Sequence, residues 1–184
     1  ESVTKPLSFN RLSNILKSAG AVLGKQTVIN YVGYMMDSYM LFTLQNYAAK
    51  LVEKETSPKY YFMDTGLLGL MLMDCSSAQL ENLVAIELIR RYGRENVFYF
   101  EKNVEIDFYV PEEKLAIQVS LQVLDQIDTR EREIGAFVKL KNFIGDATCL
   151  LITNSEEEEL DYEGVHVSVV PVWKWLLQNR KQDI

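Results

Sequence analysis

The sequence has only two cysteines, one histidine and no long apolar run. Cys75 and Cys149 share no motif spacing, and each lies in or beside an apolar run, so we expect buried thiols in a reducing cytoplasm rather than a disulfide. No stretch of about 18 apolar residues is present, and the N-terminus lacks the pattern of a signal peptide. These absences predict a cytoplasmic protein that has no membrane partner.

Nucleotide-binding and nucleophilic motifs are also lacking. Gly20, Gly24 and Gly33 have neither the strand–loop–helix context nor the Lys-Ser/Thr pair that cradles a phosphate. The single histidine, His166, has no serine or cysteine at a spacing that suggests a catalytic pair, which favours a structural or surface role. These 184 residues are therefore not expected to bind ATP.

Charge is distributed unevenly along the chain. The formal net charge of −7 gives no global electrostatic signature of a nucleic-acid binder. Residues 1–75 carry 7 Lys/Arg and 6 Asp/Glu, whereas residues 76–184 carry 12 and 20. The two halves are therefore expected to have different partners.

Residues 1–75 have the pattern of a winged-helix-like domain. Ser8 is a good N-cap for a first helix, and a second helix with one apolar and one polar row is expected to begin near Lys25. Strands are expected at residues 39–47 and 59–63, joined by a polar turn.

Residues 76–184 have the pattern of a second, mixed α/β domain. The expected elements are a buried helix at residues 78–91, a three-strand meander, a helix from about Ile127, two further strands and a terminal helix. The meander strands are expected at 97–101, 104–110 and 114–122, the later strands at 148–153 and 165–172, and the terminal helix at 173–180. Residues 155–164, rich in glutamate, are expected to form a solvated loop.

Polar residues in the meander form the main candidate for chemistry. Strand alternation predicts that Glu105, Asp107 and Tyr109 share one face, opposite Ile106, Phe108 and Val110. Gln118 and Ser120 on the next strand would extend this polar patch, and Glu81 on the long helix would reach it. Glu81, Glu105 and Asp107 are oxygen ligands that suit Mg²⁺ or Mn²⁺. The alternative, favoured by these residues alone, is that they are ordinary solvent-facing charges.

The second helix and the ribbon after it supply candidate nucleic-acid contacts. Gln26 and Asn30 are suited to base edges and Lys25 to a phosphate, although the row contains no arginine. Lys50, Lys54 and Lys59 on the expected wing are candidates for further phosphate contacts. On charge alone, a winged helix used for packing or for orienting domains is the favoured alternative.

Three short motifs, in this order and spacing, give the chain a resemblance to a known family. They are Tyr61-Phe62-Met63-Asp64-Thr65-Gly66-Leu67, Glu81-Asn82-Leu83-Val84-Ala85-Ile86-Glu87-Leu88 and Glu105-Ile106-Asp107-Phe108. The chain resembles the C-terminal region of prokaryotic AAA+-type ATPases, in which a winged helix precedes a domain similar to PD-(D/E)xK nucleases. The resemblance implies a restriction-endonuclease-like mixed sheet flanked by helices, and an ATP-binding core that would precede these residues in the intact protein.

The resemblance also assigns the vestigial-site residues one by one. Glu81 matches the family's helical acid and Asp107 its first metal-binding acid, whereas Gln118-Val119-Ser120 stands where the family pattern has Glu-Val-Lys. A metal ligand and the lysine that assists the nucleophile are both lost, so efficient hydrolysis is not expected.

Three functions follow as alternatives. The first is a non-catalytic module that couples DNA or a protein partner to the ATPase core. The second is a Mg²⁺-dependent nuclease in which Lys102 or Lys114 replaces the lost lysine, and the third is a pure protein-interaction module, favoured if the acidic half selects a basic partner.

Overall fold

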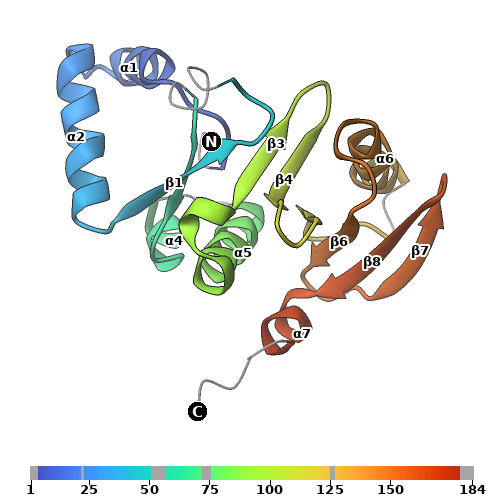
Figure 1. Cartoon of the computed structure of the whole chain (residues 1–184). Coiled ribbons are helices and arrows are strands. Elements are labelled where there is room, and N and C mark those ends of the chain that lie inside the picture. Colours follow the sequence, from blue (N-terminus) through green and yellow to red (C-terminus); the bar gives the residue numbers. More distant parts are fainter. Residues whose placement is uncertain (1–3, 22, 51–56, 72–75, 125–126, 179–184) are drawn as a thin grey trace.

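One eight-stranded sheet forms the centre of the molecule. The computed structural model describes residues 4–21, 23–50, 57–71, 76–124 and 127–178. Within these residues the strand order is β2-β1-β3-β4-β5-β6-β8-β7, and six α-helices accompany the sheet. The chain is therefore mixed α/β, as the sequence predicts (Figure 1).

Two helices stand at one end of the molecule (Figure 1). α1 (Phe9–Ser18) begins where predicted, because Ser8 accepts a hydrogen bond from the Arg11 amide at 3.3 Å and so caps the helix. α2 (Lys25–Asp37) also begins as predicted. It packs against α1 and β1 with Val28 and Val32 buried, which leaves its polar row exposed.

The ribbon after α2 is confirmed, but it belongs to the central sheet. β1 (Leu41–Asn46) and β2 (Lys59–Phe62) are antiparallel, and the end of β1 also pairs in parallel with β3. Along the other side of β2, the Leu7 amide donates to the Pro58 carbonyl and Pro6 forms a bridge with Lys59. The ribbon is therefore held on both sides and is not a free wing.

The next six elements include the long helix and the meander close to their predicted positions, except that the third meander strand ends early, at Val119. They are α4 (Gly66–Met71), α5 (Ser76–Tyr92), the short 3₁₀ helix η1 (Arg94–Asn96), β3 (Phe98–Glu101), β4 (Glu105–Val110) and β5 (Leu115–Val119). β3, β4 and β5 are successive antiparallel neighbours.

The C-terminal part adds three strands and two helices. They are α6 (Ile127–Ile144), β6 (Thr148–Thr153), β7 (Glu158–Tyr162), β8 (Val165–Pro171) and α7 (Val172–Leu177). β6 is parallel to both β5 and β8.

The prediction of a loop at residues 155–164 is wrong. Glu158–Tyr162 forms β7, an antiparallel partner of β8. Leu160 is 8% exposed and packs in the core, while the acidic residues on either side of it are exposed. One inward leucine among outward acids satisfies the alternation of a strand, and the density of charge concealed that pattern.

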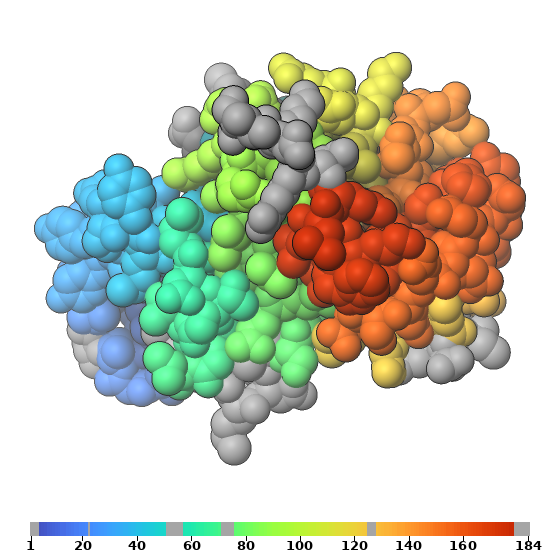
Figure 2. Space-filling view, turned by 90° about the horizontal axis from the view of Figure 1, so that it is seen from below, coloured from blue at the N-terminus to red at the C-terminus, as the bar shows by residue number. Residues whose placement is uncertain are grey.

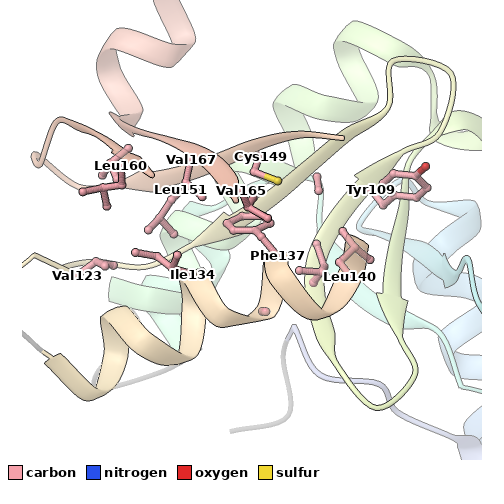
Figure 3. Close-up of a cluster of buried hydrophobic side chains, with 14 of the residues drawn as sticks. Tyr109, Val123, Ile134, Phe137, Leu140, Cys149, Leu151, Leu160, Val165 and Val167 are labelled. Atoms are coloured by element: carbon pink, nitrogen blue, oxygen red, sulfur yellow. The ribbon is translucent and has the colours of Figure 1, made fainter. Parts of the chain in front are cut away.

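Helices cover both faces of the sheet. On one face, α6 contributes Ile134, Phe137 and Leu140, which point toward Leu151 and Val167 of the sheet (Figure 3). Buried, unpaired Cys149 belongs to the same cluster, as the sequence predicts, whereas Cys75 lies outside the described residues.

On the other face, α5 and α7 bury a second cluster. It includes Val84, Leu88, Phe108, Ile117 and Trp175. Among the described residues, no helix is both long and apolar enough to cross a membrane.

Candidate functional site

A buried lysine meets three carboxylates at the site. The Lys59 Nζ lies 3.0 Å from Glu105 Oε1, 3.6 Å from Asp107 Oδ1 and 3.7 Å from Glu81 Oε1. The Lys59 side chain is only 1% exposed. We call Lys59, Glu81, Glu105 and Asp107 the lysine–carboxylate cluster. It joins β2, α5 and β4, and so unites both halves of the sequence.

Local structure on β2 and α5 fixes two members of the cluster. Lys59 and Tyr61 are two residues apart on one strand and therefore lie on the same side of it. The Tyr61 hydroxyl donates to Glu81 Oε1 at 2.9 Å. Asn82, the next residue of α5, accepts from the Phe62 amide at 2.8 Å and donates to the Phe62 carbonyl at 2.9 Å. These contacts hold the helix against the strand that carries the lysine.

An irregularity in β4 places Asp107. Phe98 lies opposite Tyr109 but Phe100 lies opposite Ile106, so three steps of β4 face two steps of β3. This is a β-bulge, and it breaks the regular alternation of side chains. Accordingly Ile106 packs in one core cluster with Tyr109, whereas Phe108 belongs to the other. The predicted shared face of Ile106 and Phe108 is therefore wrong.

Gln118 has a structural role beside the cluster. Its Oε1 accepts from the Asp107 amide at 2.8 Å, and its Nε2 donates to the Glu105 carbonyl at 3.2 Å. The Asp107 carboxylate in turn accepts from the Val119 amide at 2.9 Å. Side chains thus bridge β4 and β5 beyond Phe108–Ile117, the last backbone pair of the two strands at this end. Gln118 binds the backbone of the acidic strand and does not extend the carboxylate group.

The other residues expected to complete the site lie elsewhere. Ser120 donates to the Gln122 carbonyl at 3.1 Å. Lys102 lies over the Phe143 ring, 5.5 Å from its centre, and Lys114 is exposed in the β4–β5 turn. Neither Lys102 nor Lys114 lines the cavity at the cluster. The positive charge beside the carboxylates comes from Lys59, which the sequence predicts as a phosphate contact.

The environment makes the cluster electrostatically unusual. Burial, followed by the charge of Asp107, raises the pKa of Glu81 to about 8, and Lys59 only partly opposes this. Burial likewise raises the pKa of Asp107. Burial alone would lower the pKa of Lys59, but its three carboxylate neighbours outweigh that effect and hold it above the ordinary value. The cluster thus keeps Lys59 charged, while its buried acids hold their protons more tightly than free carboxyl groups do.

The cluster lies at a cavity of about 440 Å³. Lys5, Arg132 and Lys139 are exposed residues of its lining. No three His, Cys, Asp or Glu side chains within the described parts of the chain are arranged to hold a metal ion. The three carboxylates predicted as metal ligands instead converge on an ammonium group. As placed, they do not fit a metal ion.

The candidate nucleic-acid residues are distributed differently from expectation. Lys25, Gln26 and Asn30 are exposed on α2, where the Gln26 Nε2 donates to Asn30 Oδ1 at 3.1 Å. Lys50 is also exposed, and Lys54 lies outside the described residues. The assignment of Lys59 to a phosphate contact is wrong, because its side chain is buried among carboxylates.

One weak feature of the sequence indicates that Lys59 is buried. It alternates with Tyr61 at the start of an otherwise aromatic strand, which is unusual for a lysine on an exposed wing. Which carboxylates it meets depends on the parallel pairing of β1 with β3, and pattern and spacing do not reveal such a contact.

Comparisons with known proteins find a family model and a relative whose names describe no activity. Residues 1–78 match the family model "Domain of unknown function (DUF8612)". The chain is 32% identical to "Uncharacterized protein MJ1544" of Methanocaldococcus jannaschii, over 93% of this chain and 41% of that protein. The chain thus spans about two fifths of that relative's length. No solved structure matches the chain.

Proposed function

We propose that this chain is a non-catalytic, nucleic-acid-binding module with a degenerate nuclease-like site, from the C-terminal region of a prokaryotic AAA+-type ATPase. The observation that carries the non-catalytic part is the Lys59 ammonium, which lies within 3.7 Å of all three candidate metal ligands. One fixed positive charge replaces the metal and balances part of their charge.

The neighbours of the cluster support the loss of hydrolysis. Gln118 is neutral, and both ends of its amide are bonded to the β4 backbone. Ser120 provides no positive charge near a developing phosphorane. Lys59 is held by three ion pairs in a buried position, which favours a structural role over transient contact with a substrate.

Charge distribution supports nucleic-acid binding at the N-terminal end. Residues 4–50 contain five Lys/Arg and one Asp/Glu, in a chain of net charge −7. The five basic residues are all exposed: Lys5, Arg11, Lys17, Lys25 and Lys50. This excess of positive charge in one part of an acidic chain favours contact of a polyanion there over contact with the acidic remainder.

Calorimetric titration with Mn²⁺ and Mg²⁺ tests the non-catalytic part. We expect no binding that depends on the cluster, so the wild type and Asp107→Asn should give the same heats. Binding that Asp107→Asn abolishes and the exposed-residue control Glu112→Gln retains would overturn the proposal.

A Mg²⁺-dependent nuclease is the second candidate, because Lys59 supplies one feature that such a site needs. Lys59 brings back a positive charge at the acids, which the sequence lacks at Ser120. This candidate predicts Mn²⁺-dependent cleavage of DNA that Asp107→Asn abolishes and Glu112→Gln leaves intact. Cleavage that persists in Asp107→Asn would come from a contaminating enzyme.

Fluorescence anisotropy with labelled oligonucleotides tests the binding part. Lys25→Glu should weaken binding several-fold and reduce its salt dependence, since one phosphate contact is lost. The matched control is Lys114→Glu, which changes an exposed lysine in the β4–β5 turn by the same charge. Absence of binding to any nucleic acid would leave the protein-interaction role.

A further inference from the structure

The chain segment before α1 runs along the lysine–carboxylate cluster. Pro6 forms an isolated antiparallel bridge with Lys59, and the Leu7 amide donates to the Pro58 carbonyl at 3.1 Å. Proline has no amide hydrogen, which limits this pairing to a short contact. We call residues 4–7 the strap.

The strap reaches a second member of the cluster through Thr4. The Thr4 hydroxyl donates a hydrogen bond to the Glu81 carboxylate, and Thr4 is 9% exposed. Lys5, the next residue, lines the cavity. The strap therefore covers Lys59 and Glu81 from one side, whereas the side chain of Glu105 is 54% exposed at the cavity.

Thr4 is held in a backbone conformation that its side chain disfavours. Its φ is 67°, in the left-handed region, where a β-branched residue is an outlier. Such strain persists only where surrounding contacts impose it. The closed position of the strap thus combines a favourable hydrogen bond to Glu81 with an unfavourable backbone, and the second of these lowers the cost of opening.

The other end of the strap is fixed. Leu7 is buried, and Ser8 caps α1. α1 and α2 form one end of the molecule, the blue region in Figure 2. The strap thus connects this end of the molecule to the cluster, and Leu7 is the point about which it can turn.

We propose that the strap is a regulatory element with two positions: the closed one described above, and an open one in which Thr4 leaves Glu81 and the cluster becomes accessible to solutes. Opening relieves the backbone of Thr4 and leaves Leu7 and α1 in place. Access to Lys59 and Glu81 then depends on the strap and not on unfolding of the sheet. This inference is independent of nucleic-acid binding.

Chemical labelling of the whole chain tests whether the strap opens in the native protein. Brief treatment with acetic anhydride acetylates amines that reach water, and N-ethylmaleimide reports on the buried thiol of Cys149. Local opening exposes little surface, so in urea below the unfolding transition the acetylation rate of Lys59 should change by less than about twofold, while labelling of Cys149 rises steeply. Parallel increases at both residues would show that only global unfolding exposes Lys59, and would overturn the inference.

Substitution of Thr4 tests the contact that closes the strap. Thr4→Val keeps the branched shape but removes the hydroxyl, so Lys59 should be acetylated about fivefold faster or more, relative to the exposed Lys114. Thr4→Ser keeps the hydroxyl and should retain the wild-type rate. The matched control, Thr148→Val, makes the same change at an exposed position on β6 and should have no effect.

The labelling rate of Cys149 separates local opening from a general loss of stability. We expect Thr4→Val to leave this rate within about twofold of the wild type, because the thiol packs in the core cluster beneath α6. An unchanged Lys59 rate in Thr4→Val, or an equal increase at Lys59 and Cys149, would overturn the strap as a separate element.

Discussion

A lysine that is 1% exposed is stable only because of its neighbours. Removing an ammonium group from water costs several kcal/mol, and the attraction of nearby carboxylates compensates for that cost when the geometry is good. Lys59 has three such carboxylates, at 3.0 to 3.7 Å. The same geometry makes the acids dependent on the lysine, since three carboxylates without a cation would repel one another.

Replacement of Lys59 tests this dependence. Lys59→Met should lower the free energy of unfolding by about 3–5 kcal/mol, because breaking a buried ion pair leaves uncompensated charges. Urea denaturation measures the effect. The control Lys114→Met, at an exposed turn position, should change it by no more than about 0.5 kcal/mol. A similar small loss in both variants would show that the ammonium contributes little.

The raised pKa of Glu81 predicts a dependence of stability on pH. Its value of about 8 in the folded protein exceeds the ordinary 4.5, so the folded state keeps a proton that the unfolded chain releases. The stability that this proton provides is complete below about pH 4.5 and is lost as the pH rises through about 8.

Glu81→Gln removes this titration while keeping an oxygen to accept from Tyr61. We expect the melting temperature of the wild type to fall more steeply between pH 5 and pH 8 than that of Glu81→Gln. For a chain of this size, each kcal/mol lost lowers the melting temperature by about 2–4 °C. Parallel curves for the two proteins would contradict the raised pKa.

At the scale of elements, Asn82 is the main polar connection between α5 and β2. Its side chain is buried and satisfies both backbone groups of Phe62. Asn82→Ala would leave the Phe62 amide and carbonyl buried without these partners, at about 1–3 kcal/mol each. We therefore expect a loss of about 2–6 kcal/mol in urea denaturation, against less than about 0.5 kcal/mol for the exposed control Asn10→Ala.

Most elements could be predicted from the sequence because their signals are local. Ser8 caps α1, and the apolar pattern of β6 gives Thr148–Thr153 with the observed bounds. β7 was missed because its acids suggested a loop, although Leu160 is buried at its centre. The bulge in β4 was missed because it depends on the register with β3 and leaves no local mark.

At the scale of the molecule, the predicted division at residue 75 crosses a continuous sheet. β1 pairs with β3, and β2 supplies the cation for acids on α5 and β4. The acids of the site could be predicted from motif and alternation. Their cation could not, because it is 22 residues before Glu81 in sequence and reaches it only through the fold.

Continuity of the sheet predicts one cooperative unfolding transition. Thermal unfolding followed by far-ultraviolet circular dichroism and by tryptophan fluorescence should give coincident curves, because both tryptophans lie in the C-terminal half and circular dichroism reports on the whole chain. Loss of helical signal well before the fluorescence change would show that α1 and α2 unfold separately.

The buried lysine has a consequence for dissecting the protein. A polypeptide of residues 76–184 would contain Glu81, Glu105 and Asp107 but not the lysine that balances part of their charge, so its folded form should be least stable at alkaline pH, where the acids are ionised, and most stable in mild acid. Adding the separate 1–75 polypeptide should restore it at neutral pH. The two polypeptides would then associate into one fold, because Lys59 of the first balances charge on the acids of the second.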